Sequence, residues 1–225
     1  MEFINICGLV TCVFLAMSGW IYGAKFLKKG NYLLGFEWWI VAFSASNFVM
    51  AMLTASEINY AITLFLDSFS RSFGMPIIAV LGLMVLTHNY KPPVSKEVML
   101  FAAAFAGTFV VYLSDFFDDV RPYFYVVMWL IYSVYMVYFI VRLARIGAAM
   151  HAIASGIGTV AALAVALAYD FFPIPGDDTH MIFMTLAFTV WSYGAIQLYY
   201  AYCALERAKA DESRLFVSVG RMRCG

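Results

Sequence analysis

An acid and a base lie four positions apart within an otherwise apolar segment. Asp67 and Arg71 belong to the run LFLDSFSRSFGMP, which covers residues 64–76. Residues four apart share one face of a helix, so the two side chains can pair. Counted inward from Tyr60 at about 1.5 Å per residue, they lie roughly 10 and 16 Å below the membrane boundary. A charge at the centre of a membrane helix costs about 2.5–3.5 kcal/mol, so both residues are expected to face protein or water.

The pair has two interpretations. It can be a self-neutralising ion pair that tethers neighbouring helices. Alternatively, it borders a hydrated cavity or binding site, where Arg71 binds an anionic group or neutralises Asp67 in the empty site, and Asp67 binds a cation or carries a proton. The second interpretation is favoured by a continuous stripe of polar and small residues, formed by Thr63, Asp67, Ser70, Arg71 and Gly74. Pro76 removes a backbone donor and is expected to bend the helix beside this stripe.

Two other apolar segments carry polar residues that can converge on the same region. Glu37, Ser44 and Asn47 lie within about 80° of one another on a helix, and Asn47 has about the depth of Asp67. A second stripe is formed by Thr189, Ser192, Tyr193, Gln197 and Tyr200, with Trp191 beside it. The candidate substrate- or ion-binding residues are therefore Asp67, Arg71, Asn47, Glu37, Ser192, Gln197 and Trp191.

These candidates outline a path through the membrane. Toward its outer side and centre lie Asn47, Asp67, Arg71 and Ser192, and toward the cytoplasm lie Glu37 and Gln197. Two simpler interpretations remain open. Serine and threonine in membrane helices often bond to a carbonyl of their own helix. The carboxylate of Glu37 can instead extend to the inner membrane surface.

The sequence predicts no metal site and no cofactor. His88, His151 and His180 are far apart, and the four cysteines have no paired spacing. Motifs for phosphate loops, nucleophile elbows and zinc proteases are missing, and the last apolar segment has no lysine for a retinal Schiff base. The acidic turn at residues 177–180 can hold an external cation, although a solvated turn is the simpler interpretation. An enzyme is therefore the less favoured class.

Composition indicates that these residues lie in membrane-spanning helices. The 225 residues are 64% apolar and 12% charged, whereas soluble domains carry about one quarter charged residues. Net charge is zero, which gives no reason to expect a nucleic-acid partner. Apolar runs of about 20 residues match the thickness of a bilayer and predict an all-α, seven-helix bundle. The predicted spans are Ile4–Leu27, Tyr32–Thr54, Tyr60–Leu86, Val98–Phe117, Tyr123–Val141, Ala148–Tyr169 and Met181–Leu205.

Loop charges predict the orientation of the bundle. All 14 basic residues except Arg71 and Arg121 fall in the pieces that are cytoplasmic if the N-terminus lies outside. The opposite pieces hold Arg121 and eight of the 14 acidic residues: Glu2, Glu57, Asp115, Asp118, Asp119, Asp170, Asp177 and Asp178. We therefore expect an external N-terminus, a transmembrane domain over residues 1–205 and a cytoplasmic tail over residues 206–225.

Small and aromatic residues add two structural expectations. The fourth and sixth spans are rich in alanine and glycine, which predicts close packing against neighbouring helices rather than the lining of a site. Aromatic residues near the span ends are expected to anchor the bundle at the headgroup level. They are Trp20, Tyr22, Trp38, Trp39, Tyr60, Tyr123, Tyr199, Tyr200 and Tyr202.

A weak internal similarity suggests a repeat. Ser72-Phe73-Gly74 in the third span resembles Ser192-Tyr193-Gly194 in the seventh. Spans one to three and five to seven would then be parallel repeats joined by span four, as in some small transporters. Chance recurrence of a triplet in an aromatic-rich chain is the competing explanation.

The leading functional hypothesis is a small transporter or channel-like protein of a bacterial inner membrane. It would move a small polar or zwitterionic solute or an ion through the Asp67–Arg71 site. A seven-helix sensor or interaction subunit, with an oligomeric or other membrane-protein partner, is the alternative, and a membrane enzyme acting on lipid is the third. A transporter needs access from both faces, a sensor a cavity on one face, and an enzyme a cleft open to lipid.

Overall fold

A computed structural model describes residues 3–172, 174–177 and 179–223, except for the side chains of 213 and 215–223. Over these ranges the chain is helical and contains no strand. Seven helices are long and apolar enough to cross a membrane, which confirms the predicted number of spans. The spans are α1 Phe3–Lys28, α2 Tyr32–Thr54, a composite third span Glu57–Thr87, α5 Val94–Leu113, α6 Arg121–Arg145, α7 Ala149–Phe171 and α8 Met181–Arg223.

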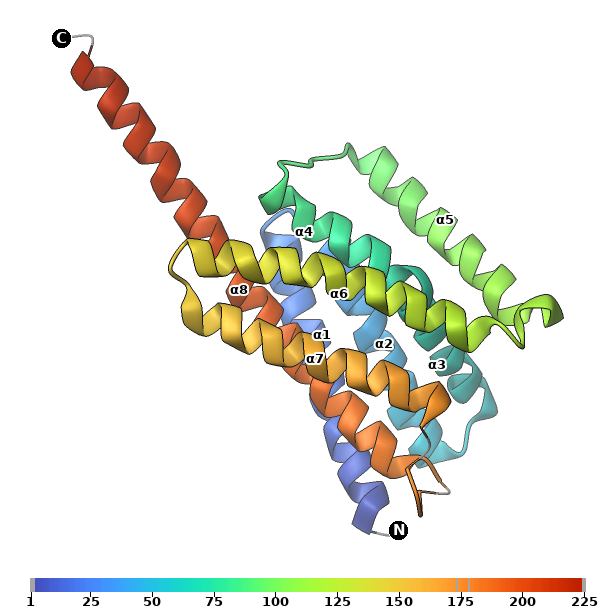
Figure 1. Ribbon diagram of the computed structural model, residues 1–225. Coiled ribbons are helices and arrows are strands. Elements are labelled where there is room, and N and C mark those ends of the chain that lie inside the picture. The colour runs from blue at the N-terminus through green and yellow to red at the C-terminus, as the bar shows by residue number, and fades with distance from the viewer. Residues whose placement is uncertain (1–2, 173, 178, 224–225) are drawn as a thin grey trace.

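Six of the spans form a closed ring, and the seventh lies outside it (Figure 1). Around the ring, α1 packs on α2, α2 on the third span, the third span on α6, α6 on α7, α7 on α8, and α8 on α1. The remaining helix, α5, packs against the third span at the edge of the bundle. Side chains on the inner faces of the six ring helices therefore meet in the interior.

The third span contains a long π-helical segment. It consists of α3 Glu57–Phe69, the π-helix η1 Ser70–Ala79 and α4 Val80–Thr87. Pro76 lies inside η1, where its missing N–H interrupts regular α-helical bonding. π-helical turns are rare and are frequent at functional sites. The predicted disturbance beside the polar stripe thus takes the form of a change in helix type.

Several predicted ends and surfaces differ from the structure. The fourth span ends at Leu113, and the 3₁₀ turn η2 Asp115–Phe117 follows it. Asp170, assigned to an outer loop, lies in the last turn of α7. Trp38 and Tyr202 are 1% and 2% exposed, so these two are core residues rather than anchors.

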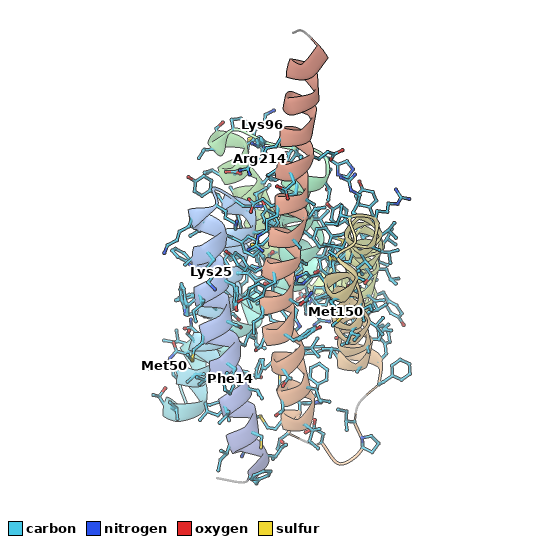
Figure 2. The ribbon with its side chains drawn as sticks, turned by 90° about the vertical axis from the view of Figure 1, so that its left-hand side faces the viewer. Phe14, Lys25, Met50, Lys96, Met150 and Arg214 are labelled. Atoms are coloured by element: carbon cyan, nitrogen blue, oxygen red, sulfur yellow. The ribbon has the colours of Figure 1, made fainter. Side chains whose placement is uncertain are left out.

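The outer face of the bundle is apolar, and most lysine and arginine residues lie at one end. Phe14 and Met50 are exposed on the lower half in Figure 2, whereas Lys96 and Arg214 lie near the end from which α8 projects. At that end Lys29 pairs with Glu206, and the ammonium of Lys209 donates to the carbonyl of Leu86 at 3.0 Å. Helix α8 continues to Arg223, beyond the predicted boundary at residue 205, so the first part of the tail is attached to the bundle.

Candidate functional site

A cavity of about 100 Å³ lies inside the ring and is lined by the polar stripe of the third span. We refer to it as the Asp67 cavity. Its polar lining residues are Ser44, Thr63, Asp67, Ser70 and Arg71. Its aromatic lining residues are Phe48, Tyr60, Trp129, Tyr169, Phe183, Phe188 and Trp191. Every ring helix contributes to the lining. The small residues Ala162 and Ala166 of α7 also contribute, so the expectation that the sixth span lines no site was wrong.

Arg71 is held in place from several sides. Its guanidinium carbon lies 4.0 Å from the ring centroid of Tyr125 and 4.1 Å from that of Tyr169. One guanidinium nitrogen also pairs with the carboxylate of Asp170. The side chain is only 6% exposed. The positive charge is therefore enclosed by two rings and a carboxylate and contributes little to the open space of the cavity.

The carboxylate of Asp67 is much less engaged. It lies 3.8 Å from the nearer guanidinium nitrogen of Arg71, on the same helical face as predicted. No hydrogen bond to this carboxylate occurs within the described residues, and its side chain is 39% exposed. Since Asp67 lines the cavity, its oxygens are available to a bound molecule.

The formal charges of Arg71, Asp67 and Asp170 do not sum to zero. Arg71 contributes one positive charge, and Asp67 and Asp170 contribute two negative charges when all three are ionised. An excess negative charge within a membrane-spanning bundle is costly unless a cation or a proton offsets it. The cluster is therefore suited to binding a cation or a proton at Asp67.

Glu37 is a second carboxyl group in the interior, on the far side of Ser70. Its side chain is fully buried, and its Oε1 accepts a hydrogen bond of 3.1 Å from the Ser70 hydroxyl. Because the side chain is fully buried, the Glu37 carboxylate does not extend to the inner membrane surface, which was the simpler interpretation of this residue. Its Oε2 has no partner among the described residues. The carboxyl group packs on Gly74, where the missing side chain leaves room for it.

A second, smaller cavity continues along the interior toward the C-terminal end of α8. This Gln197 cavity has a volume of about 40 Å³, and it shares Trp129, Ala162 and Trp191 with the Asp67 cavity. The two tryptophan rings meet edge to face, with centroids 5.4 Å apart. They form the partition between the cavities. Gln197 lines the second cavity and donates to the carbonyl of His151 at 3.2 Å.

Three sequence candidates do not line these cavities: Glu37, Asn47 and Ser192. The amide of Asn47 donates to the carbonyl of Phe43 at 2.8 Å, and the hydroxyl of Ser192 donates to that of Phe188 at 2.7 Å. Each bonds within its own helix, and neither is among the lining residues. The bond of Ser192 to a carbonyl of its own helix is the simpler interpretation that the sequence had left open for serine and threonine.

Sequence analysis missed the partners of Arg71. Asp170 was grouped with loop acids because an aspartate after Tyr169 resembles the end of a span. Tyr125 and Tyr169 gave no signal, since ring stacking across the bundle leaves no periodicity within one helix. The one available clue was Arg71 itself, because a buried guanidinium usually needs a close counter-ion.

The structure gives no support to a metal centre over the residues that it describes. No group of three His, Cys, Asp or Glu side chains is positioned to hold a metal ion there. The two carboxylate oxygens of Asp177 accept bonds from the backbone N–H groups of Ile182 and Phe183, at 3.0 and 2.8 Å. Asp177 therefore caps α8. Its neighbour Asp178 lies outside the described residues.

The chain matches no known family model, no curated protein and no solved structure. Its class follows from the fold alone. It is a multi-pass helical membrane protein with an internal cavity that contains charged groups.

Proposed function

We propose that this protein transports a small polar solute or ion across a membrane and that the Asp67 cavity is its binding site. One observation supports this function above the others. A carboxylate without a hydrogen bond among the described residues faces a cavity inside a closed ring of helices. A charged side chain at such depth is costly to maintain, and such residues mark substrate and ion pathways.

The second cavity favours transport over sensing. The Asp67 and Gln197 cavities follow one another along α7 and α8 and are separated by Trp129 and Trp191. A solute bound at Asp67 could move on once the tryptophan pair separates. A sensor needs a binding cavity but has no need for a continuation beyond it.

The proposed setting is a bacterial inner membrane with the N-terminus outside. The distribution of basic residues supports this orientation, because the cytoplasmic pieces of membrane proteins are rich in lysine and arginine. The peripheral position of α5 supports two repeats of three spans, with α5 as the helix that links them. One repeat would consist of α1, α2 and the composite third span, and the other of α6, α7 and α8. The environments of the two triplets give this repeat no further support, because Phe73 packs near Gly107 of α5 and Tyr193 near Gly158 of α7.

A sensor or interaction subunit is the second candidate. The observation that favours it is the extension of α8 to Arg223, well past the bundle. Such a helix could transmit a ligand-dependent shift to a cytoplasmic partner.

Reconstitution separates the two candidates. Purified protein in liposomes on a solid-supported membrane would be exposed to concentration jumps of cations, zwitterions and neutral solutes. Transport predicts a transient current after the concentration jump, or isotope uptake for an uncharged solute, in one solute class, and Asp67→Asn should abolish it. Asp119→Asn makes the same chemical change on an exposed turn and should retain uptake. Ligand binding without uptake in any class would favour the sensor instead.

A further inference from the structure

The walls of the Asp67 cavity are unusual for a site that binds a hydrated ion. Five aromatic rings that line it come from four different helices: Phe48, Tyr60, Trp129, Phe188 and Trp191. The faces of such rings carry partial negative charge and attract cations within about 6 Å. The cavity thus combines an apolar surface with a preference for positive charge.

The charge that this cavity presents is negative. The Arg71 guanidinium lies over the rings of Tyr125 and Tyr169, and Asp170 pairs with it. Asp67 by contrast has exposed oxygens and only the longer ion pair. A ligand entering the cavity therefore meets a carboxylate and aromatic rings before it meets the guanidinium.

Three other ligand classes fit these walls less well. An anion would approach a cluster that already has excess negative charge. Calcium and magnesium ions require about six or more oxygen ligands, and the cavity offers one carboxylate among mostly apolar groups. A neutral solute would gain nothing from the Asp67 carboxylate, whose charge a proton would then have to offset.

We propose that the Asp67 cavity binds a small organic ammonium cation, whose charge faces the Asp67 carboxylate and whose alkyl groups contact the aromatic rings. The volume of about 100 Å³ sets the size. A protein cavity of about 150 Å³ accepts benzene, so this one has room for roughly four to six non-hydrogen atoms. The proposal names the substrate class of the transport function above and rests on it for the movement of the cation across the membrane.

Three probes of similar shape but different charge test the ligand class. Tetramethylammonium is the cation, tert-butyl alcohol the neutral analogue and isobutyrate the anion, and all three have five or six non-hydrogen atoms. Binding to the full-length protein in detergent or nanodiscs would be measured by calorimetry and by the shift in melting temperature. We expect saturable binding of tetramethylammonium, at least tenfold tighter than of the other two. Equal binding of all three, or tighter binding of isobutyrate, would overturn the proposal.

Paired variants test the contacts. Asp67→Asn should weaken tetramethylammonium binding roughly tenfold or more, since a charge-assisted contact is lost, and Asp119→Asn should leave it unchanged. Phe188→Leu should weaken binding roughly two- to fivefold through the loss of a ring, whereas Phe14→Leu on the lipid-facing surface should not. If Asp67→Asn fails to fold, Asp67→Glu retains the carboxylate and should still bind the cation in preference to isobutyrate. An unchanged affinity in folded Asp67→Asn would refute the assignment.

Liposome uptake distinguishes failure of this inference from failure of the transport function. Binding of tetramethylammonium without its uptake would leave the ligand class intact and remove transport. Protein-dependent uptake of the anion, with none of the cation, would retain transport and remove the ligand class.

Discussion

The guanidinium of Arg71 in η1 pairs with the carboxylate of Asp170 in the last turn of α7, across 99 residues of sequence. The contact joins the third span to the sixth, and both spans line the Asp67 cavity. Both side chains are largely buried, with 6% and 13% exposed. Each charge therefore depends on the other, and the pair positions the wall beside Asp67.

Asp170→Asn is expected to destabilise the protein strongly. The substitution leaves Arg71 buried with only the longer contact to Asp67. Removing one partner of a buried ion pair costs about 3–5 kcal/mol, because the remaining charge stays desolvated. Denaturant titration in mixed micelles measures this loss. The double variant Arg71→Gln/Asp170→Asn should recover much of it.

The exposed pair of Arg121 and Asp118, 2.5 Å apart, provides the matched control. Asp118→Asn should cost less than about 1 kcal/mol, as exposed ion pairs usually do. Equal losses for Asp118→Asn and Asp170→Asn would show that the interior pair contributes no more than a surface pair.

Gly74→Ala tests the packing of Glu37 in the π-helical segment. A Cβ at position 74 would collide with the carboxyl group of Glu37, which is fully buried. Overpacking of this kind typically costs about 1–3 kcal/mol, which unfolding measurements should detect. Adding Glu37→Ala to Gly74→Ala should relieve the collision. Gly156→Ala in α7, where no atom lies within 4 Å of the new Cβ, should be neutral or slightly stabilising. A neutral Gly74→Ala would contradict the tight contact.

The distribution of basic residues between the two ends of the bundle predicts which end faces the outside of the cell. In a variant without native cysteines, a cysteine at Asp119 should react with an impermeant maleimide added to intact cells. A cysteine at Lys91 should react only after permeabilisation. Both native side chains are exposed at opposite ends of α5, so burial does not limit labelling. The reverse pattern at both positions would invert the orientation.

Sequence analysis predicted the helices well because hydrocarbon thickness imposes a length that hydropathy records directly. The bounds Tyr32–Thr54 of α2 agree at both ends. The spacing of Asp67 and Arg71 likewise predicted a shared face, because both residues lie on one helix. The enclosure of Arg71 by Tyr125, Tyr169 and Asp170 was not predictable, since it depends on which helices become neighbours in the ring. Asn47 and Ser192 were overvalued for the same reason, because a polar residue at the right depth can still bond to its own helix.

Trp191 is expected to control passage between the two cavities. It lines both of them, and its ring meets that of Trp129 at the partition. Trp191→Ala would remove most of one partner and join the Asp67 and Gln197 cavities. We therefore expect faster downhill flux of tetramethylammonium in liposomes, together with weaker accumulation against a gradient because the barrier no longer closes. Trp20→Ala removes an equally large ring from the exposed surface of α1 and should leave flux unchanged. Unaltered flux in folded Trp191→Ala would show that passage does not follow the line of the two cavities. The inner end of the route would then have to be sought elsewhere in the ring.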